Sequence, residues 1–285
     1  MAKEAVKYFG VDPWKITEKG FDPERSRVSE SIFSLGNEYM GTRGFFDEVY
    51  SGDSLKGNYF NGVWEDKPIT YFEHFKGLSE RCCFMINAHN WIYTRIFVNG
   101  EELDLNKCEV KDFYRELDMK RGIVTRSFIW KDVKFTFERF ISMTERTVAA
   151  QKIEMESVGF KGDIKIVAGS DFTPIHEEEN RNFWNEIFNE NGCIVARTQS
   201  SGQRVYCKFG ANMAAHRYFA EEKKACAEYN ITLGNGEKKV FERLSINIAE
   251  KDTSIADDKF IAECDIKADT LLKTSYDEYK TAHEG

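Results

Sequence analysis

Apolar and polar residues alternate through most of the middle of the chain, over residues 91–248. Short runs rich in β-branched and aromatic residues are separated there by turn residues, which is the pattern expected of antiparallel strands. In VYCKFGA, residues 205–211, an apolar side chain occupies every second position. The dipeptide Asn99-Gly100 directly follows the run WIYTRIFV and predicts a tight hairpin turn. We therefore expect many short strands joined by hairpins.

Two further pairs of runs show the same organisation. IVTRSFIW and VKFTFERF flank the two-residue turn Lys131-Asp132, and ACAEYNITL and KVFERLSINI flank the glycine-containing turn at residues 234–236. Within the last run, polar and apolar residues alternate from Arg243 to Ile248. The chain has only four prolines, so few positions would interrupt a sheet. These features predict a mainly all-β fold, built as a large antiparallel sandwich.

The pattern changes after Thr253. Apolar side chains then recur at helical spacing, and Asp257 and Asp258 suit the first turn of a helix. We expect a β domain over residues 1–255 and a helical segment over residues 256–285. Residues 174–191 are expected to form an acidic loop or a short helix between strands. The last helical run reaches Gly285 without a cap, which suggests a piece of a longer protein.

Composition and charge exclude several classes of protein. The net charge is −8, and the basic residues are interspersed with acids, which argues against a nucleic-acid partner. The sequence has no signal peptide and no apolar run of about 18 residues, so a cytoplasmic protein without a membrane span is expected. The seven cysteines are scattered and include no C-x-x-C pair, which favours reduced thiols over a metal site or a disulfide framework.

Standard catalytic motifs are absent. The sequence has no G-x-S-x-G and no H-E-x-x-H motif, and the run HEEE at residues 176–179 lacks the second histidine of a metal site. GDSLKGN, residues 52–58, has the glycine spacing of a phosphate loop, but Asn58 stands where that motif needs lysine. The histidines show no recognisable acid–base pair for an epimerase that works alone. The sequence therefore contains no standard catalytic motif, and it predicts no metal site.

The segment of residues 29–65 is rich in glycine, aromatic residues and acids. Asp47, Glu48, Asp53 and Glu65 supply carboxylates of the kind that glycosidases pair, but sequence cannot place two of them together. The aromatic residues of this segment could stack on a sugar, although burial in a β core is the commoner role of such side chains. A ligand cradle and a tightly packed loop both remain open at this point.

A family resemblance distinguishes these readings. ESIFSLGNEYMGTRGFFDEVYSGDSLKGNYFNGVWE, residues 30–65, resembles the N-terminal signature of glycoside hydrolase family 65, the family of the maltose, kojibiose, nigerose and trehalose phosphorylases. NGEELDL, YRELDMKRGIVTRSFIW and ERFISM are also similar to that family. MINAHNW resembles another family segment, with Ala88-His89 in place of the usual Leu-Pro. SYDEYKTAHEG resembles the start of the family's helical linker, so the resemblance spans essentially the whole chain.

The resemblance implies a galactose mutarotase-like super-β-sandwich, followed by a helical linker, an (α/α)6 barrel and a small C-terminal β domain. In the family, the general acid and the phosphate-binding loop belong to the barrel, so this chain alone is expected to be inactive. The parent enzyme would carry out inverting phosphorolysis of an α-glucosidic disaccharide to β-glucose 1-phosphate and glucose. The resemblance implies no cofactor for the parent enzyme. Inorganic phosphate would be one of its substrates. Some family members are hydrolases, and the identity of the disaccharide stays open.

Under this interpretation the chain is a non-catalytic domain that packs on the barrel, shapes the entrance to the active site and aids formation of a homodimer. Arg43 and Asp53 would anchor loops or the domain interface, and Tyr59 and Trp64 would border the sugar pocket. The alternative is an independent carbohydrate-binding module. In that case glucose, maltose or kojibiose would bind saturably, and Trp64→Ala would abolish the binding.

Overall fold

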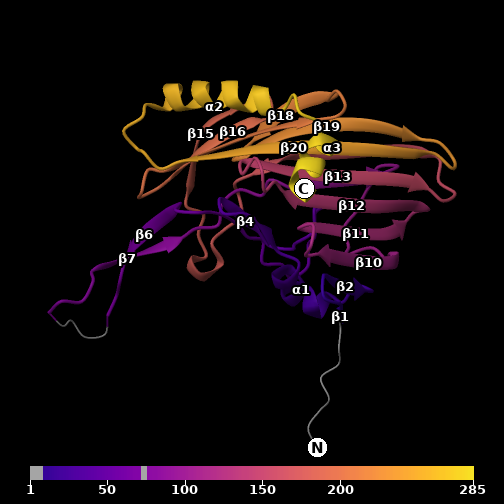
Figure 1. Ribbon diagram of the computed structural model, residues 1–285, viewed down its shortest axis with the longest axis horizontal. Coiled ribbons are helices and arrows are strands. Elements are labelled where there is room, and N and C mark those ends of the chain that lie inside the picture. Colours follow the sequence, from indigo (N-terminus) through magenta and orange to yellow (C-terminus); the bar gives the residue numbers. More distant parts are fainter. Residues whose placement is uncertain (1–8, 72–75) are drawn as a thin grey trace, which may run out of the picture.

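The computed structural model describes residues 9–71 and 76–285, and these residues form a mainly β fold of antiparallel sheets with helices at the C-terminal end (Figure 1). The predicted fold class is confirmed. The predicted hairpins with turns at Asn99-Gly100 and Lys131-Asp132 are also present, as β8–β9 and β11–β12. Asn99, Lys131 and Asp132 have positive φ, the backbone conformation that such two-residue turns require.

The largest sheet of the described residues has ten strands in the order β1-β2-β10-β11-β12-β13-β20-β17-β16-β15. Each neighbouring pair runs antiparallel. The strands are β1 Phe9–Val11, β2 Lys15–Lys19, β10 Lys111–Asp118, β11 Ile123–Trp130, β12 Val133–Ile141, β13 Val148–Ser157, β15 Trp184–Glu190, β16 Cys193–Thr198, β17 Arg204–Ala211 and β20 Lys238–Glu250.

A five-stranded sheet packs against the inner face of the large sheet, in the order β18-β19-β14-β8-β9. Its strands are β8 Thr94–Val98, β9 Glu101–Glu102, β14 Gly162–Asp171, β18 Arg217–Glu221 and β19 Lys224–Leu233. The turn at residues 234–236 therefore does not close a hairpin within one sheet. It carries the chain from β19 in the small sheet to β20 in the large one, so it joins the two layers of the sandwich.

The remaining short strands lie in the N-terminal third of the chain. β3 Leu35–Gly36, β4 Met40–Thr42 and β5 Asn58–Phe60 form a three-stranded sheet beside helix α1 Ser26–Ile32, which follows the 3-10 helix η1 Pro23–Arg25. β6 Trp64–Pro68 and β7 Arg81–Met85 form a separate two-stranded sheet in the part of the chain that the structure describes. This β6–β7 hairpin projects from the body of the molecule (Figure 1).

The sequence prediction for residues 174–191 is wrong in its second half. The 3-10 helix η2 Glu177–Glu179 lies in the expected loop, but Trp184–Glu190 forms strand β15. Within the described residues, β15 is the outermost strand of the large sheet and has β16 as its single paired neighbour. Because an edge strand leaves much of its surface in solvent, its polar side chains are tolerated there and conceal the usual apolar alternation.

Two helices cover the outer face of the large sheet. α2 Asp257–Leu271 lies over β17 and β20, and α3 Tyr276–Glu284 follows it (Figure 1). Phe260, Cys264 and Ala268 of α2 are buried, as the helical spacing predicts. A second apolar core forms beneath the helices, and its sheet residues include Phe140, Val148, Ala150, Tyr206, Leu244 and Ile246. The helices thus bury a face of the sheet that would otherwise meet solvent.

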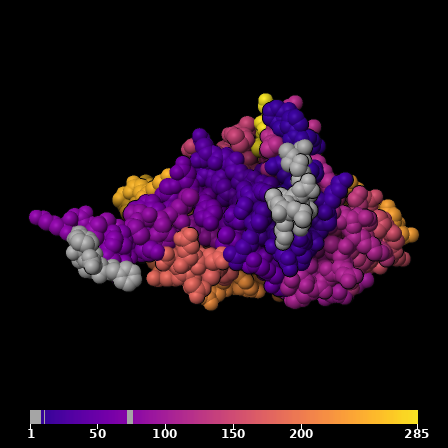
Figure 2. Space-filling view, turned by 90° about the horizontal axis from the view of Figure 1, so that it is seen from below, coloured from indigo at the N-terminus to yellow at the C-terminus, as the bar shows by residue number. Residues whose placement is uncertain are grey.

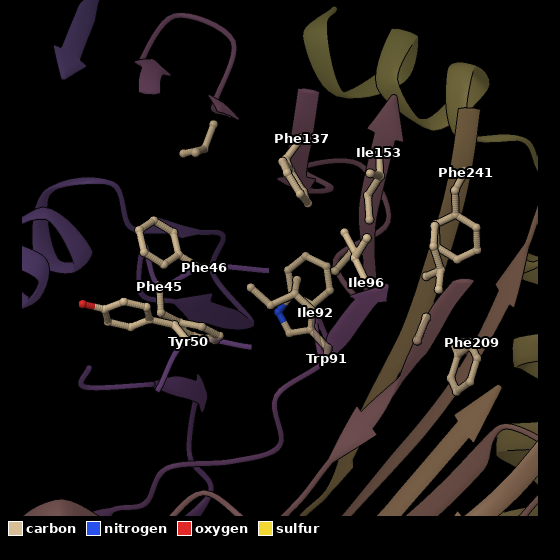
Figure 3. Close-up of a cluster of buried hydrophobic side chains, with 14 of the residues drawn as sticks. Phe45, Phe46, Tyr50, Trp91, Ile92, Ile96, Phe137, Ile153, Phe209 and Phe241 are labelled. Carbon is tan, nitrogen blue, oxygen red and sulfur yellow. The ribbon is translucent and has the colours of Figure 1, made fainter. Parts of the chain in front are cut away.

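The main core lies between the two large sheets and contains most of the buried aromatic side chains. Figure 3 shows Phe45, Phe46 and Tyr50 gathered at one side of this core. The core also contains polar groups that sequence alternation alone would place in solvent. Arg243 and Asn247 of β20 are buried on the inner face, and the Arg243 side chain donates hydrogen bonds to the carbonyl of Gly169 at 3.0 Å. Both faces of β20 are therefore buried.

The seven cysteines are free thiols, of which four are buried and Cys83 is exposed. No helix in the described part of the chain is long and apolar enough to cross a membrane.

Candidate functional site

The glycine-rich segment lies against the inner face of the large sheet, where three buried arginines of neighbouring strands hold it. Arg115 of β10 donates to the carbonyl of Gly44 at 3.0 Å, and Arg139 of β12 donates to that of Phe45 at 2.8 Å. Arg126 of β11 lies between them and forms an ion pair with Glu48. Burial of the Arg115 guanidinium lowers its pKa to about 10. These contacts fix the course of the segment before it reaches the surface.

Two of the carboxylates that glycoside chemistry could use belong to this buried network. Glu48 pairs with Arg126, and Asp47 accepts a hydrogen bond from Gln151 at 2.8 Å and lies 3.4 Å from both Arg126 and Arg139. Both side chains are almost fully buried. A carboxylate enclosed by guanidinium groups has no access to a substrate, so this pair serves packing rather than catalysis.

The Arg43 side chain lies outside the buried arginine network. It holds together the part of the glycine-rich segment that lies near the surface. Its Nε donates to the carbonyl of Leu55 at 2.9 Å, and its Nη2 donates to Ser31 Oγ at 2.8 Å and to the carbonyl of Arg27 at 3.2 Å. The side chain therefore connects helix α1 to the loop that precedes β5. Glu30 of α1 reinforces the same connection, because its carboxylate accepts from the backbone amide of Leu55 at 2.7 Å.

Asp53 lies at the surface and pairs with Arg27 of α1 through three hydrogen bonds of 2.7–2.9 Å. The hydrogen bond with Arg27 lowers the pKa of Asp53. The other end of the same guanidinium donates to Glu177 Oε1 at 2.8 Å. Arg27 thus bridges the glycine-rich segment and the acidic loop around η2, two parts of the chain that the sequence separates widely.

Tyr59 lines a cavity of about 270 Å3 between these two segments. Burial raises the pKa of Tyr59, and its hydroxyl has no hydrogen-bond partner among the residues that the structure describes. The other lining residues come from the loop before β5, from the segment after β7 and from the acidic loop: Leu55, Lys56, Asn87, Ile175, His176, Glu177 and Glu178. Figure 2 shows the purple and indigo surface of the N-terminal segment meeting the salmon surface of a later segment. The cavity offers an aromatic ring, an ammonium, an imidazole and carboxylates to a polar ligand.

Position 57, beside this cavity, requires a glycine because there is no space for a side chain. A Cβ atom at position 57 would lie 2.6 Å from Cδ of Arg43 and 2.9 Å from the ring of Tyr59. Both distances are shorter than real Cβ contacts, so any side chain at position 57 would displace Arg43 or Tyr59. The glycine therefore allows these two side chains to approach the same piece of backbone.

Asn87 has a structural role at the cavity that sequence reasoning missed. Its side chain accepts from the amide of Asn58 at 2.9 Å and donates to the carbonyls of Lys56 at 2.7 Å and Ile175 at 3.2 Å. One amide group thus joins three segments that are distant in sequence. The buried Oδ1 of Asn58 has no partner among the described residues, which leaves an unsatisfied acceptor next to the cavity.

Trp64 does not line the cavity. It begins β6, where its amide donates to Oε1 of Gln203 at 2.9 Å and its carbonyl accepts from Ser201 Oγ at 2.7 Å. Its side chain is 38% exposed. Of the four residues singled out from the sequence, Arg43 and Tyr59 lie together, Asp53 is linked to their surroundings through Arg27, and Trp64 belongs to a different part of the surface.

The cavity beside Tyr59 is a polar recess whose loops are held by ion pairs. Glu177 is engaged by Arg27, and Glu179 pairs with Lys67, so two of the three acids of η2 hold the loop in place. Within residues 9–71 and 76–285, no group of three His, Cys, Asp or Glu side chains comes together in a way that could hold a metal ion. The geometry suits hydrogen bonding to a polar partner across the cavity.

Comparison with a family model gives a match over residues 16–285, to the description "Glycosyl hydrolase family 65, N-terminal domain". Among curated proteins, the chain is 36% identical to maltose phosphorylase of Bacillus subtilis (strain 168) over 202 residues, which cover 67% of this chain and 27% of that protein. It is 29% identical to kojibiose phosphorylase of Thermoanaerobacter brockii over 279 residues, which cover 92% of this chain and 34% of that protein.

A solved structure agrees with this relationship over almost the whole chain. A protein from the human microbiome that was proposed to be a kojibiose phosphorylase matches with a TM-score of 0.90 and 33% identity. The match covers 97% of this chain and 38% of that one. The chain therefore spans about a third of the length of these relatives.

Proposed function

Because the chain belongs to the family of glycosyl hydrolase family 65 N-terminal domains, we propose that it is the non-catalytic N-terminal part of a disaccharide phosphorylase. The observation that carries this proposal is the family match over residues 16–285, together with relatives about three times as long. The parent reaction would be inverting phosphorolysis of an α-glucosidic disaccharide. The residues that perform it would lie in the part of the relatives that this chain does not cover.

We further propose that the surface around Tyr59 faces the catalytic part and shapes the entrance to its active site. Support comes from the arrangement of the site, in which Arg27, Arg43 and Asn87 hold the loops rigidly while the Tyr59 hydroxyl and the Lys56 ammonium have no partner among the described residues. Rigid loops with free polar groups are suited to complete a binding pocket formed by another domain. Packing is the first role of the segment, and contact with substrate is the second.

The non-catalytic role has a direct test. The 285-residue chain is incubated with maltose, kojibiose or trehalose and inorganic phosphate, and β-glucose 1-phosphate is measured. We expect no product above a heat-inactivated control. Turnover of any of the three disaccharides by this chain alone would contradict the proposal.

The role of the Tyr59 surface is tested in a phosphorylase that carries this sequence as its N-terminal part. Arg43→Ala is expected to lower the unfolding midpoint, because it removes three hydrogen bonds that hold the loop. Tyr59→Phe is expected to raise KM for the disaccharide several-fold without changing that midpoint. A rise in KM alone for Arg43→Ala would favour a ligand cradle over the packing role.

A further inference from the structure

A second and larger cavity lies at one end of the large sheet. Two hairpin turns and the last turn of α3 form its walls. Its volume is about 560 Å3, and its walls are residues 12–15 of the β1–β2 turn, part of the β10–β11 turn and Glu284. This volume falls within the range of roughly 300–1,000 Å3 that is typical of small-molecule sites. The cavity shares no lining residue with the cavity at Tyr59.

Trp14 is one of the lining residues of this cavity, and hydrogen bonds hold its backbone on both sides. Its amide donates to Asp12 Oδ1 at 2.7 Å, and its carbonyl accepts from the amide of Met119 at 2.7 Å. The residue is nevertheless 57% exposed, and its indole nitrogen donates to no residue that the structure describes. An exposed indole on a fixed turn combines a flat apolar face with a free hydrogen-bond donor.

The charged groups around the indole balance one another. Three acids (Asp12, Asp118 and Glu284) and three cations (Lys15, Lys120 and Arg121) line the cavity, so their formal charges cancel. Several of them are already engaged. One oxygen of Asp12 and one of Asp118 accept backbone amides of their own turns. The Lys15 ammonium pairs with Glu116.

Other polar groups of the cavity remain free to bind a ligand. The second oxygen of Asp12 and the Lys120 ammonium have no partner among the described residues, whereas the second oxygen of Asp118 lies 3.9 Å from Nε of Arg121. An anionic ligand would meet the three acids, and a cationic ligand would meet the three cations. A neutral ligand with many hydroxyl groups can use donors and acceptors together.

From these observations we propose that Trp14 is the stacking platform of a saccharide-binding site. A pyranose has an apolar C–H face that can lie on the indole, and its hydroxyls can donate to the aspartates and accept from the Lys120 ammonium. The site is assigned from its own residues and does not rest on the role proposed for the Tyr59 surface. A free sugar and the end of a longer glucan present the same chemistry to it.

The test is isothermal titration of the 285-residue chain with glucose, maltose and maltoheptaose. We expect saturable binding of at least one sugar and a loss of at least tenfold in affinity for Trp14→Ala. Trp14→Phe keeps a stacking face and is expected to retain most of the affinity. Trp64→Ala is the matched control, because Trp64 is also partly exposed but lies outside the cavity, and it should bind within twofold of the unchanged chain.

If Trp14→Ala does not fold, NMR of the unchanged chain can still test whether sugar binds at Trp14. In a 15N-labelled chain, the indole N–H signal of Trp14, assigned by its disappearance in Trp14→Phe, should shift on addition of sugar and saturate. The proposal is overturned if no sugar gives saturable heat, if the Trp14 signal stays unmoved at saturation, or if Trp64→Ala rather than Trp14→Ala removes binding. Longer glucans binding more tightly than maltose would identify a polymer end as the natural source.

Discussion

The buried arginines determine how the glycine-rich segment attaches to the sheet. Arg126 and Glu48 are both almost fully buried, and their pairing replaces the water that each charge would otherwise need. Removing one partner leaves the other charge buried and unpaired, and this loss of folding free energy is large. An intact buried pair, by contrast, stabilises the protein little or not at all compared with hydrophobic residues of similar size. Stability at this point depends on both residues together.

Replacing Arg126 with methionine should therefore destabilise the protein by about 3–5 kcal/mol. The measurement is equilibrium urea unfolding followed by tryptophan fluorescence. Glu101→Gln is the matched control, because it breaks the exposed pair of Glu101 with Lys131, and its effect should stay below about 1 kcal/mol. An Arg126→Met protein within 1 kcal/mol of the unchanged protein would contradict this account of the network.

Gly57 gives a second prediction at the scale of single residues. Gly57→Ala places a methyl group 2.6 Å from Cδ of Arg43, so Arg43 or the backbone must move, at a cost of about 1–3 kcal/mol. Thermal unfolding measures this loss. Gly41→Ala in the neighbouring strand β4 is the control, since the new Cβ atom would lie at an ordinary 3.7 Å from the carbonyl oxygen of Leu35. Equal melting temperatures for the two variants would show that the close approach at Gly57 is unimportant.

Sequence reasoning identified the glycine-rich segment as important but could not assign its residues to roles. Arg43 and Tyr59 stand close in sequence and were predicted together, whereas Asn87 and Arg27 act through contacts with Lys56, Ile175 and Glu177. Such roles depend on which distant loops meet, and no local pattern carries that information. The neutral character of the Trp14 cavity is hidden for the same reason, because its charges come from two turns and a helix end.

At the scale of elements, the position of α2 is fixed by Asp257 in its first turn. The carboxylate accepts from Arg197 of β16 at 2.5 Å and from Arg204 of β17 at 2.9 Å. Burial alone would raise the pKa of Asp257, but the hydrogen bonds from Arg197 and Arg204 lower it overall. The same carboxylate lies at a helix N-terminus, where negative charge is favourable.

Asp257→Asn should lower the free energy of unfolding by about 1–2 kcal/mol at pH 7, since the nearly buried Arg204 loses its charged partner. Because folding lowers the pKa of Asp257, its contribution is complete above the unfolded value of about 3.9 and is lost as pH falls through the folded value. The difference between variant and unchanged protein should thus be constant from about pH 7 to 5 and shrink below about pH 4.

Asp258→Asn serves as the control for this experiment. Asp258 lies in the same first turn and is exposed, so it shares the helix N-terminus without the two arginines. Its replacement should cost only a few tenths of a kcal/mol. The ion-pair account fails if both asparagine variants lose the same stability, or if the loss for Asp257→Asn stays unchanged at pH 3.

The elements themselves differ in how far sequence predicts them. β11, β12 and their turn follow from strict alternation around Lys131-Asp132, and α2 follows from the spacing of Phe260 and Cys264. The turn after β19 has an equally strong local signal, yet it connects two sheets rather than two paired strands. A turn signal specifies where the chain reverses, but the partner of each strand depends on packing between layers. Strand β15 was not predicted, because it lies at the exposed edge of the sheet and carries polar residues there.

At the scale of the whole molecule, the large sheet is buried on both faces over much of its area. Its inner face meets the five-stranded sheet and the glycine-rich segment, and part of its outer face meets α2 and α3. Tyr276 of α3 packs edge-on against Phe140, and His283 stacks on the same ring at 4.8 Å. The helical segment that the sequence predicts from residue 256 therefore packs against the outer face of the large sheet.

This arrangement predicts that residues 1–255 are less stable than the full chain. Removal of residues 256–285 uncovers apolar side chains of the sheet, among them Phe140, Leu244 and Ile246, that are at most 7% exposed. Burial of each such side chain contributes about 1.5–3 kcal/mol, so their joint exposure is large compared with a typical total stability of about 5–15 kcal/mol. We expect the shortened chain to bind the dye ANS, to aggregate on heating and to unfold at much lower urea concentration.

A chain that ends at Thr274 separates the contributions of the two helices. It keeps Phe260, Cys264 and Ala268 of α2 in place but loses Tyr276, Tyr279 and the cover over Phe140. Because the larger share of the outer core lies under α2, this chain should have an unfolding midpoint between those of the other two forms. If residues 1–255 instead unfold cooperatively with the midpoint of the full chain and bind no ANS, the sandwich is independent of its helices, and the boundary at residue 255 separates two autonomous units.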